Sequence, residues 1–107
     1  MNFKRMAITA LGVFLMAAPL KAYSQSSEDI FLDKCANCHG KDGAGQTAKG
    51  KKLKLRDLRS TDVQKMTDPQ MADVISKGNK DMDGYAKELN EKQIKDLVAY
   101  LRTFAKK

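Results

Sequence analysis

The sequence predicts an all-α domain of three to four helices, and two observations support this. First, apolar residues recur at helical spacing in the C-terminal segment, where one face is made by Ile94, Leu97, Val98 and Leu101. Second, residues that favour helix ends flank the apolar segments, whereas no run of alternating apolar and polar residues predicts a strand. We therefore expect a single small helical domain, preceded by a segment of a different kind.

That preceding segment has the composition of a secretory signal peptide. Lys4 and Arg5 come before an apolar run over residues 6–20, and small residues follow the run. The run is too short for a comfortable membrane span. We expect cleavage after Ser24, with Ala22 as the alternative position, and an uncleaved anchor is the competing interpretation.

Cleavage assigns residues 1–24 to the signal peptide and residues 25–107 to the domain, which then has 83 residues. The removed segment carries three basic residues and no acid, so the formal net charge falls from +7 to +4. Such a mildly basic domain gives no reason to expect a nucleic-acid partner, and no membrane insertion is expected after cleavage. A domain this small has little apolar surface to bury, and a buried prosthetic group would enlarge its core.

The first helix is predicted over residues 27–36. Ser26 and Ser27 offer N-cap hydroxyls, and Glu28 and Asp29 place negative charge in the first turn, where the helix dipole favours it. The helix leads directly into the most informative motif of the chain.

That motif is Cys35-Ala-Asn-Cys38-His39, the signature of covalent haem attachment. Residues three apart share one helix face, so both sulfurs can reach the vinyl groups of one porphyrin. His39 follows the second cysteine and is placed to ligate the iron. We expect one haem c, held by thioethers to Cys35 and Cys38. His39 is the one histidine in the sequence, so a second axial ligand must be another residue type.

Three other interpretations of the motif remain open. A thioredoxin-like dithiol requires a βαβ surrounding, which the sequence does not predict. A structural zinc site needs four ligands, and Cys35, Cys38 and His39 leave it one short unless chains share the metal. A structural disulfide would leave His39 without a role.

Residues 40–54 are expected to form a loop, because they contain four glycines and five lysines and lack apolar periodicity. One helical turn is expected over residues 61–66. A short helix is predicted over residues 68–77, with Asp68 as its N-cap and Pro69 in its first turn.

The last helix is predicted over residues 90–105. Asn90 is a good N-cap with Gln93 three residues later, and Leu89 and Ile94 occupy the positions of a hydrophobic staple.

Methionine is the natural second ligand to a haem iron that has one histidine ligand. The domain offers Met66, Met71 and Met82. Met71 lies on the apolar face of a predicted helix, where methionine more often fills a core, and Met66 ends a predicted turn. Met82 lies in a polar loop, so we assign it the distal position. The alternatives are an exposed methionine, a lysine ligand or an open coordination site.

With these motifs in order, residues 27–106 resemble a class I monohaem c-type cytochrome of the small bacterial periplasmic kind. The resemblance rests on Phe31 four residues before Cys35, on Cys-x-x-Cys-His-Gly followed by Lys-Asp-Gly-x-Gly, on the Met82 loop, and on Leu-Val-Ala-Tyr-Leu at residues 97–101. It implies the cytochrome c fold, in which the N- and C-terminal helices cross beside one haem. It also implies that Phe31 and Tyr100 are in contact.

Two features depart from the family pattern. Asp83 follows Met82, where the family commonly has proline. No proline lies between His39 and Pro69 to supply the carbonyl that usually accepts the histidine Nδ1–H. We expect a carbonyl of residues 49–55 to accept it instead.

The resemblance implies a periplasmic one-electron carrier rather than an enzyme, because an iron with two protein ligands has no site for substrate. Its partners are expected to be a membrane-bound reductase as donor and an oxidase or other reductase as acceptor, met by a monomer in transient encounters. Basic residues are expected to steer an acidic partner: Lys41, Lys49, Lys51, Lys52, Lys54 and Arg56. The alternatives are a haem protein that binds small gases or peroxide, if Met82 does not ligate, and a periplasmic dithiol protein, if no haem attaches.

Overall fold

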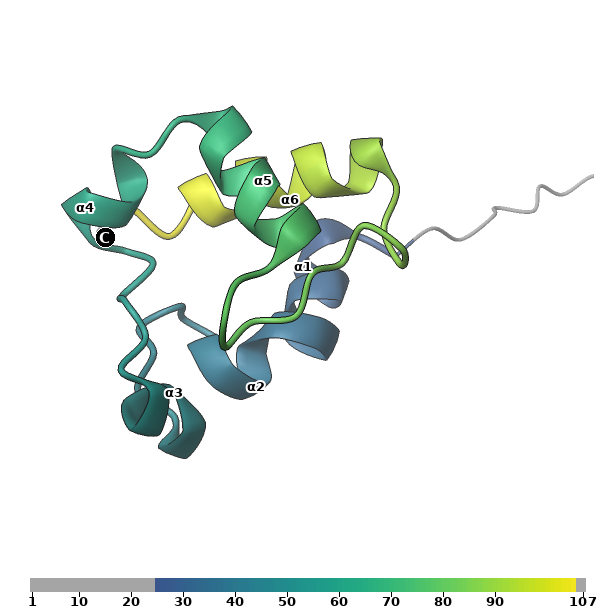
Figure 1. Ribbon diagram of the computed structural model, residues 1–107. Coiled ribbons are helices and arrows are strands. Elements are labelled where there is room, and N and C mark those ends of the chain that lie inside the picture. The colour runs from purple at the N-terminus through teal and green to yellow at the C-terminus, as the bar shows by residue number, and fades with distance from the viewer. Residues whose placement is uncertain (1–24, 106–107) are drawn as a thin grey trace, which may run out of the picture.

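The computed structural model describes residues 25–105, and within them all regular structure is helical (Figure 1). The predicted signal peptide over residues 1–24 lies outside the described residues. No helix within residues 25–105 has both the length and the apolar character needed to cross a membrane. The absence of strands from this part of the chain confirms the all-α prediction and leaves no βαβ unit for a thioredoxin-like site.

The N-terminal helix consists of three consecutive segments, α1 (Ser27–Ile30), η2 (Phe31–Cys35) and α2 (Ala36–His39). Ser26 caps it, since its Oγ accepts a hydrogen bond from Asp29 N at 3.1 Å. The middle segment is a short π-helix, in which the helix is wider than an α-helix; such segments are frequent at functional sites. The predicted helix is therefore confirmed, and it continues through the whole cysteine motif.

The prediction of a loop over residues 40–54 is wrong in its last part, because α3 spans Ala48–Leu53. Thr47 begins this helix by accepting a hydrogen bond from Gly50 N, and Lys54 ends it in the left-handed conformation with φ 54°. The helix is too short to show an apolar period, so its caps were the only local signal.

The next two helices, α4 (Thr61–Gln64) and α5 (Asp68–Lys77), match the predicted segments. The predicted cap of α5 is wrong by one residue. Thr67, not Asp68, is the N-cap, because Thr67 and Gln70 form a reciprocal capping box through side chain and backbone.

The last helix, α6 (Glu91–Arg102), begins at Asn90 as predicted and ends before the expected residue 105. Asn90 and Gln93 form a second capping box. The residues beyond Arg102 are turns, held by hydrogen bonds from Phe104 N to Leu101 O at 3.1 Å and from Ala105 N to Arg102 O at 3.2 Å.

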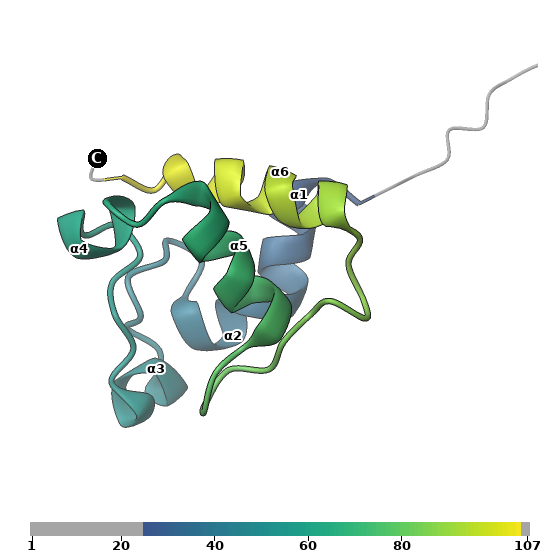
Figure 2. The ribbon, with the colours of Figure 1, turned by 45° about the horizontal axis from the view of Figure 1, so that its top comes forward.

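The two ends of the domain meet in its core. α6 packs against α1 and α5, and Figure 2 shows α6 lying across the end of the N-terminal helix. Phe31, only 1% exposed, lies with its ring centroid 5.7 Å from that of Tyr100 and 5.1 Å from that of Phe104. The contact between Phe31 and Tyr100 is therefore confirmed, and Phe104 completes an aromatic cluster.

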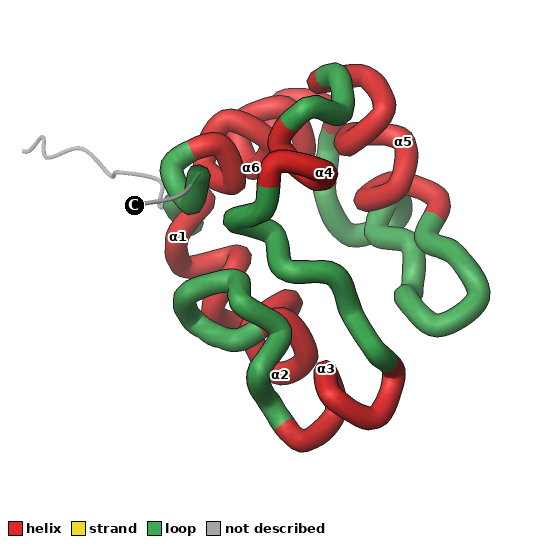
Figure 3. The backbone as a smooth tube through the Cα atoms, turned by 90° about the vertical axis from the view of Figure 1, so that its left-hand side faces the viewer, coloured by secondary structure: helices red, strands yellow, loops and turns green. Residues whose placement is uncertain are grey.

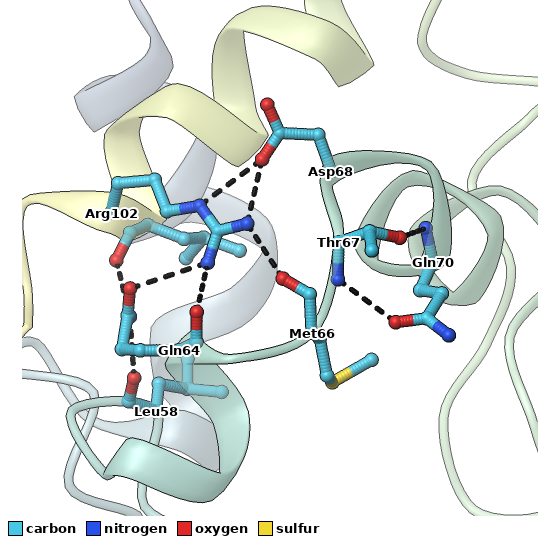
Figure 4. A network of polar contacts seen from close by, with 8 residues as sticks. Leu58, Gln64, Met66, Thr67, Asp68, Gln70 and Arg102 are labelled. Carbon is cyan, nitrogen blue, oxygen red and sulfur yellow. Dashed lines mark hydrogen bonds and ion pairs between the residues drawn. The ribbon is translucent and has the colours of Figure 1, made fainter.

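Arg102 joins the end of α6 to the segment between α4 and α5 (Figure 4). Its guanidinium donates to Gln64 O at 2.6 Å, to Met66 O at 2.7 Å and to Asp68 Oδ1 at 2.7 Å. Figure 4 shows the Met66 side chain pointing away from this guanidinium. The planar guanidinium of Arg102 thus donates hydrogen bonds to two backbone carbonyls and one carboxylate of this segment.

Replacing Arg102 by Ala is expected to lower the free energy of unfolding by about 2 kcal/mol, because charge-assisted hydrogen bonds to backbone carbonyls are lost. Denaturant titration of the haem-loaded protein would measure the change. Arg59→Ala is the matched control, since the Arg59 guanidinium donates to the carboxylate of Asp57 at 2.9 Å and both side chains are partly exposed, so the change should have a much smaller effect. Equal losses in the two variants would contradict this account.

Candidate functional site

A cavity of about 290 Å³ lies between the N-terminal helix, α5 and the two long loops. Figure 3 shows these loops, one joining α3 to α4 and the other leaving the end of α5. The cavity is lined by side chains from segments distant in sequence, among them Phe31, Cys35, His39, Met66, Met82 and Leu97. The structure therefore brings Cys35, His39 and Met82, predicted separately, to one apolar cavity.

His39 lies at the end of α2, and its Nδ1 atom is buried without a hydrogen-bond partner. The expectation that a carbonyl of residues 49–55 accepts this nitrogen is therefore wrong in this structure. The carbonyls of Gly50 and Lys51 are already engaged, because they accept hydrogen bonds at the end of α3 from Leu55 N and Lys54 N. Burial lowers the pKa of His39, so the neutral imidazole, which can donate a lone pair to a metal, is the favoured form.

The two cysteines of the motif are free and half-buried. Burial raises the pKa of the Cys35 thiol to about 11, so this thiol stays protonated at neutral pH. The structure therefore shows two thiols rather than the alternative disulfide. Within residues 25–105, His, Cys, Asp and Glu side chains form no group of three or more that could hold a metal ion, so the zinc alternative gains no support.

The loop over residues 40–47, called here the glycine-rich loop, stabilises the backbone of the motif by hydrogen bonds. Thr47 Oγ1 donates to Cys38 O at 2.6 Å, and Gly45 N donates to His39 O at 2.7 Å. Gly50 packs so closely that a Cβ there would lie 2.7 Å from Cys38 O and would clash with Gly45 O. A larger residue at position 50 would therefore displace the motif itself. Thr47 is a site residue that sequence reasoning missed, because its contact with Cys38 spans nine positions of an irregular segment.

Met82 lies across the cavity in the loop that leaves α5, and its side chain is half-buried. The loop folds back onto the end of α5, since Tyr85 N donates to Ile75 O at 2.8 Å and Ala86 N donates to Ser76 O at 3.2 Å. Tyr85 also contacts the N-terminal helix, because its hydroxyl donates to Lys34 O at 3.3 Å. The loop is thus held to both walls of the cavity.

The other two candidate methionines also line the cavity. Met71 is a core residue that is 4% exposed, as its place on the apolar face of α5 predicts. Met66 is partly buried, and its sulfur lies 4.0 Å from Arg56 Nη2. All three methionines therefore line one cavity: Met71 is carried by α5, Met66 by the short link between α4 and α5, and Met82 by the loop after α5.

These residues suit a covalently attached haem. Thiols at positions 35 and 38 can form thioethers, the neutral imidazole of His39 and a thioether are both ligands of haem iron, and the cavity has the apolar lining that a porphyrin needs. The buried Nδ1 atom of His39 has no hydrogen-bond partner within the described residues, so no contact there explains why this polar imidazole is buried.

Comparisons with known proteins agree with this chemistry. The model of the family described as cytochrome c oxidase, cbb3-type, subunit III matches residues 24–101. Among solved structures, the KustC0563 c-type cytochrome has 28% sequence identity and a TM-score of 0.71, over 77% of this chain and 100% of that chain. A point mutant of Kustc0563 has 29% identity and a TM-score of 0.68, over 75% of this chain and 99% of that chain. No curated protein matches the sequence significantly.

Proposed function

Because the chain belongs to the family of the cbb3-type oxidase subunit III cytochrome domain and is a small monohaem c-type cytochrome, we propose that it is a periplasmic one-electron carrier. In this proposal, Cys35 and Cys38 attach a single haem c. His39 and Met82 are the axial ligands of its iron.

One observation carries this proposal: a single cavity is lined by Cys35 and His39 on the N-terminal helix and by Met82 on the loop after α5. Met82 lies more than 40 positions after His39 in the chain, and nothing in their local sequences requires the two segments to meet. A porphyrin held between a histidine and a methionine requires this placement.

A haem with two protein ligands supplies reversible one-electron redox chemistry of its iron. The chain's own residues keep the structural change between the two oxidation states small. Apolar side chains such as Phe31 and Leu97, each 1% exposed, exclude water from the inner end of the cavity. The braced motif on one side and the anchored Met82 loop on the other keep the two ligands in place, so little has to rearrange between oxidation states.

The proposed partners are a membrane-bound reductase as donor and an oxidase or other reductase as acceptor. Lys54 and Arg56 line the cavity, and the neighbouring lysines on and before α3 are exposed. No acidic residue occurs between Asp42 and Asp57 in the sequence, so this segment contributes only basic charge to the surface. Such a surface favours approach of an acidic partner to the cavity side of the molecule.

Electron transfer to the anion hexacyanoferrate(III) is expected to be faster for the native protein than for the Lys51→Glu/Lys52→Glu variant, and this difference should shrink at high salt. Stopped-flow kinetics at several ionic strengths would measure it. The control is Lys92→Glu/Lys95→Glu, which makes the same charge change beside a separate groove between α5 and α6. An equal slowing by both variants would show an effect of net charge alone and would remove the steering role.

The proposed function is tested by visible spectra of the protein expressed with haem-maturation machinery, recorded oxidised, then reduced, then under carbon monoxide. We expect a haem that resists denaturing extraction and a reduced spectrum that carbon monoxide does not change. A carbon monoxide shift in the native protein would instead favour a ligand-binding haem protein. Absence of covalent haem would overturn the proposal and return the cysteines to a dithiol role.

A further inference from the structure

We propose that Asn79 is a positioning residue for the distal ligand, holding the backbone of Met82 so that its thioether stays at the iron. This inference rests on the proposed ligation by Met82. It assigns to the Asn79 side chain a role that no sequence motif suggested.

The Asn79 side chain makes two hydrogen bonds to the ligand segment. Its Oδ1 accepts from Asp81 N at 3.0 Å and from Met82 N at 3.0 Å. The Asn79 backbone N–H completes the contact by donating to Met82 O at 2.9 Å. Both the amide nitrogen and the carbonyl of Met82 are therefore bonded to one residue, which itself lines the cavity.

The surrounding loop leaves Met82 little room to shift. Gly78 has a φ of 73°, and a Cβ at this position would clash with Met82 O. A Cβ at Gly84 would lie 2.6 Å from Ser76 O on the end of α5. Only residues without a side chain permit this close folding, so Gly78 and Gly84 form the turn and Asn79 holds Met82 within it.

The hydrogen bonds of Asn79 matter because the residue after Met82 is not a proline. A proline there would restrict the backbone of Met82 through its ring, and Asp83 supplies no such restriction. In this chain the restriction comes instead from the hydrogen bonds of Asn79. Removing the side chain leaves two amide N–H groups to bond water, which lets the ligand loop sample conformations in which the thioether has left the iron.

The test compares Asn79→Ala with Asn79→Asp in the haem-loaded protein. Native binding of carbon monoxide is expected to be too weak to change the spectrum at ordinary gas pressure, so affinities are compared under raised pressure. There, Asn79→Ala is expected to raise the apparent affinity of the reduced protein by about tenfold, because the conformation in which Met82 is bound loses the support of a hydrogen bond. It should also weaken the near-infrared absorption of the methionine–iron bond in the oxidised protein. Asn79→Asp keeps an acceptor oxygen and is expected to restore both properties toward those of the native protein.

Asn90→Ala is the matched control. Asn90 makes the same kind of bond, its Oδ1 accepting from Gln93 N at 2.8 Å, but it caps α6 and does not line the cavity. It is expected to lower stability without changing carbon monoxide affinity. If Asn79→Ala and Asn90→Ala changed this affinity equally, the effect would be general loosening of the fold and the inference would be overturned.

Met82→Ala separates this inference from the function on which it rests. If Met82→Ala binds carbon monoxide tightly and Asn79→Ala behaves as the native protein, Met82 is the ligand and Asn79 does not position it. If Met82→Ala does not bind carbon monoxide, the proposed ligation itself fails. Tight binding by Met82→Ala, with an intermediate affinity for Asn79→Ala and rescue by Asn79→Asp, supports both.

Discussion

The Met82→Ala variant is expected to retain its covalently attached haem and to bind carbon monoxide when reduced, whereas the native protein does not. Attachment depends on Cys35 and Cys38 of the N-terminal helix rather than on the loop that carries Met82; Cys35 lines the cavity, and Cys38 O accepts a hydrogen bond from Thr47. Removing the thioether takes away the distal ligand and leaves the iron with His39 alone. The shift of the reduced visible spectrum under carbon monoxide measures this change directly.

The other two methionines of the cavity supply the controls for this experiment. Met66→Ala and Met71→Leu are expected to remain insensitive to carbon monoxide, although Met71→Leu alters a core residue and should cost some stability. If Met66→Ala bound carbon monoxide and Met82→Ala did not, the distal ligand would be Met66. The experiment therefore decides among all the thioethers that the structure brings to the cavity.

Replacing Phe31 by Ala is expected to destabilise the haem-loaded protein by about 3–5 kcal/mol. Phe31 is 1% exposed, lies against the rings of Tyr100 and Phe104, and also lines the haem cavity. Its loss would create a void where α1, α6 and the cavity meet. Because native proteins are stable by only about 5–15 kcal/mol, this loss should remove a large fraction of the free energy of unfolding. Denaturant titration followed by far-ultraviolet circular dichroism measures the loss.

Leu32→Ala is the matched control for this prediction. Leu32 is the neighbouring residue on the same helical segment and is 41% exposed, so its truncation should change stability far less. A similar loss in both variants would show that the helix, rather than the packing between the two ends of the chain, limits stability.

Local sequence was enough to predict most helices, because their signals lie within a few residues of each other. The segment 68–77 was predicted with the bounds of α5, and Asn90 was recognised as the cap of α6. The prediction of Asp68 as the N-cap of α5 was wrong, although the local sequence held the correct signal: Thr67 and Gln70 have the spacing of a capping box. α3 was missed because a six-residue helix is too short to show a period.

The bonds that hold the site together were not predictable in this way. Thr47 contacts Cys38, and Arg102 contacts Gln64 and Met66, across separations that no local pattern records. The expected acceptor for His39 Nδ1 was not found, since this buried nitrogen has no hydrogen-bond partner within the described residues. Asn79 looked like an ordinary polar loop residue until the fold of its loop was known.

By itself, the sequence determined the all-α class, the main helices and the family, since caps, periodicity and the Cys-x-x-Cys-His motif all act between near neighbours. Only the tertiary structure decided that Met66, Met71 and Met82 share one cavity with His39, and that Asn79 holds one of them. The physical reason is that these contacts arise when helices bury their apolar faces against one another, and the position of each side chain then depends on the whole core rather than on its own segment.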